Sequence, residues 1–596
     1  MNSKAIFIID EVLIIFISHL FFYLILAYKI IDRIMAKNEK HQHKKDVIVK
    51  KETSKKASDE GFLGQMELWF EKHNDKIFFI LLFFSTLFSL LLFDSKVSPG
   101  GDDSSYIERA WLFLHEGKFP YFQGPAYPVF LSLFVKMFGL NVIGLKFFSV
   151  ICQFGFVWVT FLTFRKRIPY TVLFALLAFI SFNNFIQYYA SQTFTETFFL
   201  FVQSICLYIV FKIIDSIDNE SSWIENVKQN YLKWLLFGLL FTLLSISKSI
   251  AIVAIVGVVL YFVLNKNYKQ AMIAIVAFAT IRFAYTLIAT ALFGANDTDQ
   301  LEMMLRIDLY KPAMGHEGFG GMVSRFFNNF NTYISLHMYR ILNLRSFQYD
   351  ASKIIPALSY ISTVILAIIT FLSYKRNKFI FFSSIYLIVL CGGIFFGVQA
   401  NNMQDRLLII AMPLIFLVLF FGAYDLAKRV SSIQYVFILF AGIMLLVTVG
   451  KSTIQAKKNT AALKKNLSGD IYYGYTPDWE NFLKMSKYCA DSLPANAQVL
   501  SRKPNMSFIY GNGKKFPAQY WVTTTNADSV LMEWKKQNIT YVLLPTLRMN
   551  PAKNNGRFIN TLHRMMQPVA EKYPQKLILV KTIGTDEPTY LYEIKY

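Results

Sequence analysis

The sequence predicts an α-helical polytopic membrane protein, with about twelve transmembrane helices and a small α/β domain at the C-terminal end. Composition is the first reason: the 596 residues are 54% hydrophobic and 17% aromatic, and the mean hydropathy is +0.38. A soluble protein of this length rarely contains so much apolar surface. The second reason is that uncharged apolar runs long enough to cross a bilayer recur along the chain. The third is the polar composition after residue 450, where short alternating runs replace the long ones.

Each predicted span is a run of about 20 mostly apolar residues, or a slightly shorter run with polar flanks. The runs are residues 7–28, 76–95, 142–163, 170–187, 196–214, 233–247, 249–264, 270–293, 353–373, 378–397, 406–424 and 433–450. The first run is longer than the core of a signal peptide and has no clear small-x-small cleavage site, so we expect a retained helix.

Lys and Arg residues in the short loops predict the orientation of these spans. The segment 29–56 contains ten of them, which places it in the cytoplasm by the positive-inside rule. Tracing the helices onward puts every strongly basic short loop on that same side, namely 165–167, 266–269, 375–378 and 428–429. The formal net charge of +22 therefore reflects membrane topology, and we expect no nucleic-acid partner.

The same trace divides the chain into expected domains. They are an N-terminal transmembrane helix (1–28), a basic cytoplasmic linker (29–75), the main transmembrane domain (76–450) and an extracytoplasmic soluble α/β domain (451–596). The last domain has strand-like and helical runs at 478–492, 498–501, 528–537, 540–544, 576–581 and 589–594. We expect a multi-pass protein of the inner (plasma) membrane, with this domain and the loops near residues 102, 192 and 294–350 outside the cytoplasm.

An adjacent carboxylate pair, Asp102 and Asp103, follows the second span on the extracytoplasmic side. Adjacent carboxylates repel, and each needs a proton, a cation or a bound substrate to neutralise it. Such a carboxylate can act as a general base toward a hydroxyl group, or it can hold a divalent cation. The alternative is structural, because Asp103-Ser104-Ser105 is also a good sequence for a helix N-cap.

Three further charged residues lie at the same predicted membrane boundary. Glu196 opens a helix, Lys248 stands between two apolar runs, and Arg406 begins a late span. A lysine or arginine at that depth can bind the phosphate of an anionic lipid. Two of the residues also have a structural alternative. Thr195 and Glu196 suit a helix N-terminus, and Lys248 can extend its charged end to the interface.

The extracytoplasmic loop 294–350 is less informative. Its amphipathic part, Phe326 to Leu344, has the length and pattern of a lid over a site. His316 and Glu317 invite a metal interpretation, but no third ligand is evident in the sequence and we expect no metal there. Arg282 lies inside an apolar run, which indicates an internal partner or a functional cation.

The motifs together resemble those of the GT-C glycosyltransferases, polytopic enzymes that use lipid-phosphate-linked sugars. The first external loop of protein O-mannosyltransferases and lipid A aminoarabinose transferases is similar to Asp102-Asp103-x-x-Tyr106 followed by Gly124-Pro125-x-Tyr127-Pro128. Glu196, the segment 238–248 and Arg406 then occur in the family's order.

Two details depart from the family pattern. Ala126 stands where the family often has a second proline, and Leu407 stands where an aromatic residue usually follows the arginine. The first departure is small, and the second makes the match at Arg406 looser.

The resemblance implies a GT-C fold and a hexosyl- or pentosyltransferase whose catalytic residues lie in 76–450. It implies a polyprenyl-phosphate-linked sugar as donor and an extracytoplasmic glycan, lipid or protein as acceptor. Its implied site residues are Asp102 as general base with Asp103 beside it, Lys248 and Arg406 for the donor phosphate, and Glu196, Tyr106 and Tyr127 for substrate binding. No metal ligand and no certain cofactor follow, and a divalent cation stays open.

Two other functions remain as alternatives. A ligase or polymerase of lipid-linked glycans, acting on diphosphate-linked donors, would share the topology and the cations but would not need the Asp102 loop. A lipid or solute transporter would place charges near helix centres and show repeat symmetry. The sequence has few central charges and no internal repeat, which favours the transferase.

Overall fold

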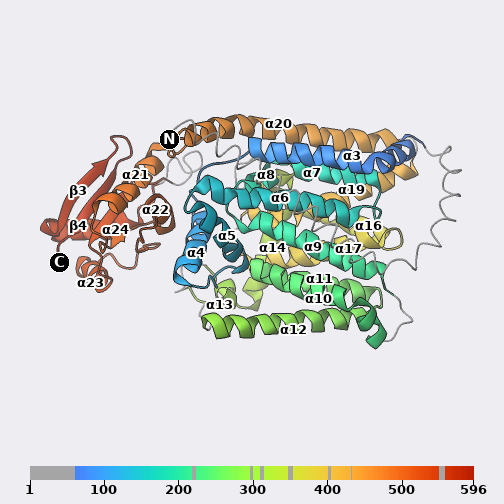
Figure 1. The fold of residues 1–596 in the computed structure, drawn as a ribbon, viewed down its shortest axis with the longest axis horizontal. Helices are drawn as coiled ribbons and strands as arrows, with labels where there is room; N and C mark the ends of the chain where they lie inside the picture. Colours follow the sequence, from blue (N-terminus) through green and yellow to red (C-terminus); the bar gives the residue numbers. More distant parts are fainter. Residues whose placement is uncertain are drawn as a thin grey trace.

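Helices dominate the computed structural model of the chain, which describes residues 61–217, 223–294, 300–308, 314–345, 353–399, 404–430, 433–548 and 558–596. They run roughly along one common direction and form a bundle, with a separate small domain at one end (Figure 1). The predicted first span at 7–28, and the linker up to residue 60, lie outside the described residues.

Eight of the described helices are long and apolar enough to cross a membrane. These helices are α3 (Phe62–Leu91), α6 (Val142–Phe164), α9 (Thr195–Asp215), α10 (Trp223–Ser247), α12 (Tyr268–Phe293), α16 (Pro356–Ser373), α17 (Lys378–Gly397) and α20 (Gln434–Leu467). They coincide with eight of the predicted spans. Runs of Leu, Ile, Val and Phe place apolar side chains against the lipid, and the helix satisfies its own backbone hydrogen bonds.

The other three predicted spans in the described chain are interrupted helices. Their parts are α7 (Tyr170–Phe182) with α8 (Asn184–Ala190), η1 (Ser249–Ala251) with α11 (Ile252–Leu264), and α18 (Arg406–Ile409) with α19 (Met412–Arg429). The first pair bends by 59° at its break. Asn183 causes the restart there, since its side chain accepts the backbone N–H groups of Phe185 and Ile186.

Two long helices extend past the predicted domain boundaries. α3 begins at Phe62, inside the predicted linker, and α20 continues past residue 450 to Leu467. The second half of α20 packs on the end of α3, where Asn459 donates a hydrogen bond of 2.6 Å to the backbone oxygen of Leu92. The two helices lie side by side along one edge of the bundle (Figure 1). α20 thus connects the membrane bundle to the C-terminal domain as one continuous rod.

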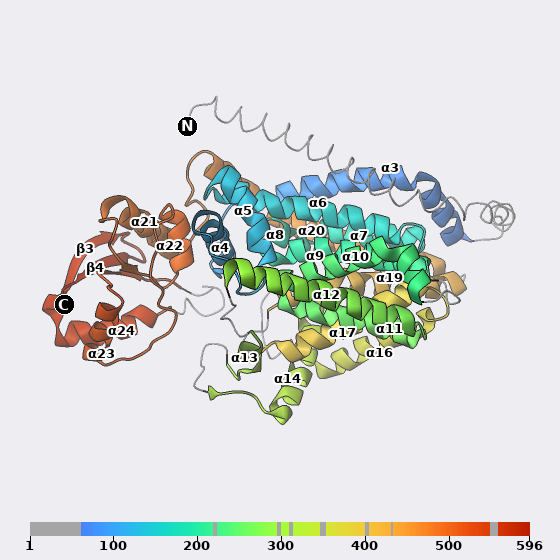
Figure 2. The same cartoon turned by 60° about the horizontal axis from the view of Figure 1, so that its bottom comes forward.

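The two ends of the bundle differ in charge and in content. The basic loops form ion pairs at one end, with Arg165 to Asp75 at 3.0 Å and Arg167 to Asp215 at 2.7 Å. At the other end lie the short helices α4 (Asp102–Glu116), α5 (Ala126–Phe138), α13 (Gln300–Leu305) and α14 (Phe319–Thr332). Figure 2 shows α4 and α13 at the end that faces the C-terminal domain.

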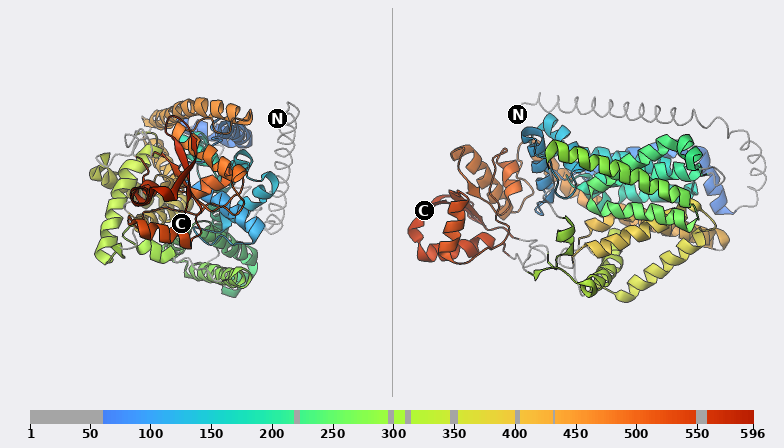
Figure 3. Two further views of the ribbon diagram at one scale, coloured as in Figure 1. Left: turned by 90° about the vertical axis from the view of Figure 1, so that its left-hand side faces the viewer. Right: turned by 90° about the horizontal axis from the view of Figure 1, so that it is seen from below.

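The C-terminal domain is a four-stranded sheet with helices packed on it. Its elements are α21 (Pro477–Ser492), β1 (Val499–Leu500), α22 (Pro504–Tyr510), α23 (Ala527–Lys536), β2 (Tyr541–Pro545), α24 (Thr561–Lys572), η7 (Pro574–Lys576), β3 (Leu577–Ile583) and β4 (Thr589–Ile594). The strand order is β1-β2-β4-β3; β1 pairs parallel to β2, and β4 is antiparallel to β2 and β3. The predicted strands and helices are confirmed, and the right-hand view of Figure 3 shows this domain at one end of the molecule.

Candidate active site

Four charged side chains from distant parts of the sequence meet at the end of the bundle that carries α4. Arg406 pairs with Asp102 at 2.5 Å between Nη2 and Oδ2. Lys248 pairs with Glu196 at 2.7 Å between Nζ and Oε1. The two pairs adjoin, since Arg406 Nε lies 3.9 Å from Glu196 Oε1. We call Asp102, Glu196, Lys248 and Arg406 the four-charge cluster; its formal charges balance.

Each member of the cluster stands at a helix end or a helix break. Asp102 is the first residue of α4, after Gly101 with a φ of 90°, a backbone conformation that favours glycine. Glu196 is in the first turn of α9, and Lys248 separates α10 from η1. Arg406 begins α18. Acidic side chains in a first helical turn are stabilised by the helix dipole, so both carboxylates occupy positions that favour their charge.

Exposure falls from one side of the cluster to the other. The Asp102 side chain is 43% exposed and that of Arg406 is 19% exposed, whereas Lys248 is 16% and Glu196 only 1% exposed. A carboxylate buried as deeply as Glu196 is costly without a cation beside it. Its second oxygen, Oε2, has no hydrogen-bond partner among the described residues. The cluster therefore has an open side at Asp102 and a floor at Glu196.

Asp103 occupies a different environment from its neighbour. It is fully buried, and its carboxylate accepts the backbone N–H groups of Ser98 at 2.7 Å and Ser104 at 2.9 Å. Burial raises the pKa of this carboxyl to about 6. These contacts hold the turn before α4. Asp103 is not the helix N-cap that the sequence offered as an alternative, because α4 begins at Asp102 after Gly101 and no side chain caps it.

Tyr106 and Tyr127 pack together behind Asp102. Tyr106 follows Asp102 by one helical turn, and its ring lies 4.7 Å from the Arg109 guanidinium. The Tyr127 ring meets Tyr106 edge-on at 5.3 Å and also packs on Phe148. Both tyrosines are buried, so they support the wall of the site from behind.

A second charged group, which the sequence did not reveal, adjoins Arg406. Asp405 forms ion pairs with His337 and with Arg340, the latter at 3.0 Å. His337 lies in η3 (Tyr333–Met338), a π-helical turn, and Arg340 in α15 (Tyr339–Ile341). All of η3 is buried, so residues 333–338 of the predicted lid lie in the core of the bundle. Nothing in the sequence links His337 to Asp405.

The side chains weighed as metal ligands have other partners. His316 lies 3.3 Å from Glu302, and Glu317 pairs with Arg325 at 3.1 Å. Within the described ranges, no group of three His, Cys, Asp or Glu side chains is arranged to hold a metal ion.

The C-terminal domain contacts both α4 and the turn that precedes it. Lys503 donates to the backbone oxygens of Pro99 at 3.0 Å and Gly100 at 3.3 Å, next to the start of α4. Further along α4, Asn505 donates to Glu108, and Lys515 pairs with Glu116 at 2.5 Å. Burial lowers the pKa of Lys503 to about 8. These contacts join regions some four hundred positions apart, and no sequence pattern predicted them.

Comparisons with known proteins identify the fold. No family model and no curated protein sequence matches the chain. Among solved structures, the Archaeoglobus fulgidus oligosaccharyltransferase tethered to an acceptor peptide is similar, with 12% identity, a TM-score of 0.53, and 89% of this chain and 75% of that chain covered. The same organism's AglB, in complex with an inhibitory peptide and a dolichol-phosphate, gives 12%, 0.51, 88% and 74%.

ArnT from Cupriavidus metallidurans in the apo state is 10% identical over 86% of this chain and 97% of that chain, with a TM-score of 0.49. Sequence identities this low support a conclusion about the fold only. The similarity confirms the architecture that the motifs predicted: this polytopic helical membrane protein, with its small C-terminal α/β domain, has the fold of these archaeal oligosaccharyltransferases.

Proposed function

We propose that the chain is an integral membrane glycosyltransferase that transfers a hexosyl or pentosyl group from a polyprenyl-phosphate-linked donor to an extracytoplasmic acceptor. The observation that carries the proposal is the four-charge cluster, which joins an exposed carboxylate to two cations at the membrane boundary. The fold supports it, because AglB has been captured with a dolichol-phosphate and a peptide.

Asp102 is the general base in this mechanism. It is the most exposed member of the cluster, so an acceptor hydroxyl or amine can approach its carboxylate. The carboxylate takes the proton as the acceptor attacks the anomeric carbon. The bond from that carbon to the phosphate oxygen breaks, and its electron pair leaves with the polyprenyl phosphate. One base and one stabilised leaving group suffice for such an inverting displacement.

Lys248 and Arg406 bind the donor phosphate and stabilise it as it leaves. Each cation is paired with a carboxylate in the structure, so the phosphate has to draw Arg406 away from Asp102. Donor binding then frees Asp102 to accept a proton. The base becomes available only when the donor is in place.

The remaining site residues take positioning roles. Glu196 holds Lys248 through Oε1, and its unpartnered Oε2 can accept a hydrogen bond from a sugar hydroxyl. Tyr106 and Tyr127 support the wall behind Asp102. Asp103 shapes the turn before α4.

The site faces the extracytoplasmic side of the inner (plasma) membrane. The argument is the positive-inside rule, applied to the basic loops at the opposite end of the bundle. The C-terminal domain contacts α4 at the same end as the cluster, so it lies where an acceptor glycan, lipid or protein has to approach.

The test is transfer by the purified full-length protein in detergent or nanodiscs. Lipids that co-purify are identified by mass spectrometry, and polyprenyl-phosphate-linked sugars are then supplied as donors. We expect release of polyprenyl phosphate and a glycosylated acceptor with at least one donor, and loss of both products in Asp102→Asn. Transfer from diphosphate-linked donors alone, or turnover that persists in Asp102→Asn, would contradict the proposal.

A further inference from the structure

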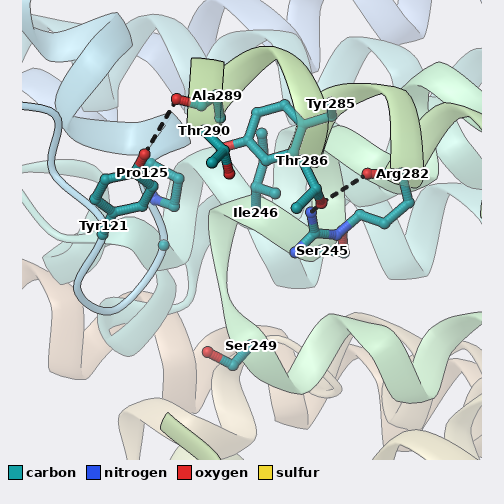
Figure 4. A pocket seen from close by; sticks show the side chains of 11 residues that line it. Tyr121, Pro125, Ser245, Ile246, Ser249, Arg282, Tyr285, Thr286, Ala289 and Thr290 are labelled. Atoms are coloured by element: carbon teal, nitrogen blue, oxygen red, sulfur yellow. Dashed lines mark hydrogen bonds between the residues drawn. The ribbon is translucent and has the colours of Figure 1, made fainter. Parts of the chain in front are cut away.

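A cavity outside the four-charge cluster lies between α10, η1 and α12. Its volume is about 210 Å³, and its lining includes Tyr121, Ser245, Ser249, Arg282, Thr286 and Thr290. Figure 4 shows Tyr121 and Pro125 at one end of it, Arg282 at the other, and Ser249 across from α12. We call it the α12 pocket.

Contacts of α10, α12 and Tyr121 surround the α12 pocket. α10 and α12, which both line it, touch so closely elsewhere along their length that a Cβ atom on Gly238 would lie 2.7 Å from the Ala277 backbone oxygen. The Tyr121 hydroxyl donates to the backbone oxygens of Gly294 at 2.6 Å and Ala289 at 3.2 Å. Tyr121 belongs to the loop between α4 and α5, so the pocket borders the segment that follows α4.

Arg282 places a positive charge at one end of this pocket, near the middle of α12. It stands 11 residues before Phe293 and 14 after Tyr268, the two ends of α12, or roughly 17 Å and 21 Å along the helix axis. Its Nη1 donates 2.8 Å to Thr286 Oγ1, and its guanidinium lies 5.2 Å from the Tyr285 ring.

Among the described residues, none of the ion pairs within 4.0 Å involves Arg282. An arginine inside a membrane span is costly unless an anion or a polar path accompanies it. Thr286 and Tyr285 offer a hydroxyl and an aromatic face, neither of which neutralises the charge. Among the residues that the structure describes, then, this cation has no carboxylate beside it.

We propose that the α12 pocket binds the phosphate of a lipid headgroup, with Arg282 as its counter-ion. The planar guanidinium suits a phosphate, which it can bind through two parallel hydrogen bonds. Hydroxyl side chains of Ser245, Ser249 and Thr290 line the same space. Next to the pocket, the large apolar side chains of Phe283, Leu287 and Leu292 are exposed, which provides an apolar surface for the lipid's hydrocarbon chain.

This site is separate from the proposed donor site, although it adjoins it. Ser249 lines the pocket and directly follows Lys248, but no member of the four-charge cluster lines it. Two sources can supply the phosphate: a polyprenyl phosphate waiting beside the reaction centre, or an anionic phospholipid of the bilayer. Both present the same group at the same depth.

Binding of defined lipids to the full-length protein tests the proposal. Native mass spectrometry from detergent counts bound undecaprenyl phosphate, phosphatidylglycerol and, as a neutral reference, phosphatidylcholine. We expect Arg282→Ala to weaken binding of one of the two anionic lipids at least 10-fold, and Thr290→Trp, which fills the pocket, to do the same. The lipid that responds identifies the source. Lys269→Ala, which removes a positive charge at the other end of α12, is the matched control.

The outcomes separate this site from the donor site. If undecaprenyl phosphate is the ligand of the α12 pocket, the protein binds two molecules of it. Arg282→Ala then removes the molecule in the pocket, and Lys248→Ala removes the molecule in the donor site. If Arg282→Ala and Thr290→Trp bind both anionic lipids as the Lys269→Ala control does, the proposal is wrong. Lipid binding that depends on Arg282 in a protein without transferase activity would leave this site standing while the proposed function falls.

Discussion

Arg406 Nη2 lies 2.5 Å from Asp102 Oδ2, which joins the cation proposed to bind the donor phosphate to the proposed base. The pair couples two steps that are otherwise independent, donor binding and proton transfer. A phosphate that binds Arg406 has to compete with Asp102 for the guanidinium. Substitutions at the two positions should therefore be non-additive.

Asp102→Asn should lower kcat by about 100-fold or more, because the amide keeps the shape of the side chain but cannot accept the proton. Donor binding should be largely retained. Asp103→Asn is the internal control: its position is buried, so transfer should fall much less. Initial rates with saturating donor would measure both. A larger loss in Asp103→Asn than in Asp102→Asn would indicate that Asp103 is the base.

Lys248→Ala and Arg406→Ala should each weaken donor use by about 1.5–3 kcal/mol, the range for a lost charge-assisted hydrogen bond. Acceptor KM should change little. Lys248→Arg should be tolerated better than Arg406→Lys, because Arg406 approaches two carboxylates through two different nitrogens and a single ammonium cannot replace them. Steady-state kinetics with varied donor would test this. Unchanged donor kinetics in both alanine variants would contradict the proposal that Lys248 and Arg406 bind the donor phosphate.

Stability should depend on pH through Asp103. Its pKa in the folded protein is about 6, above the ordinary value of 3.8, so the folded state holds the proton more tightly than the unfolded state. The resulting stabilisation is fully present below about pH 4 and is lost as the pH rises through about 6, with an upper limit of about 3 kcal/mol. Thermal unfolding in detergent from pH 4 to 7 would show it. Asp103→Asn should flatten this part of the profile, and an unchanged profile would show that Asp103 is not responsible.

Lys503→Met should lower kcat by about 10-fold, less than the ~100-fold that a 1 Å misplacement of a reacting group can cost. The lysine holds the backbone of Pro99 and Gly100, so its loss loosens the start of α4, which carries Asp102. Donor KM should stay the same, because no contact joins Lys503 to Lys248 or Arg406 in the described structure. Lys536→Met, on the exposed surface of α23, is the matched control. Equal rates in the two variants would limit Lys503 to a structural role.

Cysteine labelling should place the α4 loop and the C-terminal domain on one side of the membrane and the basic loops on the other. Lys118, Ser468 and Lys166 are exposed, and all four natural cysteines are buried, so single introduced cysteines will report cleanly. A membrane-impermeant maleimide added outside should label Lys118→Cys and Ser468→Cys but not Lys166→Cys. Labelling of Lys166→Cys from outside would invert the topology.

The sequence by itself determined the membrane class, the positions of the spans in the described chain and the strands of the C-terminal domain. These features depend on local patterns, because a span needs about 20 apolar residues and a strand alternates with a period of two. Local patterns also placed Asp102, Glu196, Lys248 and Arg406 at one membrane boundary. They could not show that α20 runs on to Leu467, since its polar second half packs on α3 and no apolar run marks it.

Only the tertiary structure decided which residues meet. Two adjacent carboxylates look alike in the sequence, yet the first turn of α4 exposes Asp102 to Arg406 and buries Asp103 against backbone N–H groups. Asp405 pairs with His337, and Lys503 donates to the backbone oxygen of Pro99. Both contacts join segments that no local sequence pattern relates. The physical reason is that such contacts arise from the packing of whole helices and domains, which brings distant side chains together without leaving a mark on the residues around them.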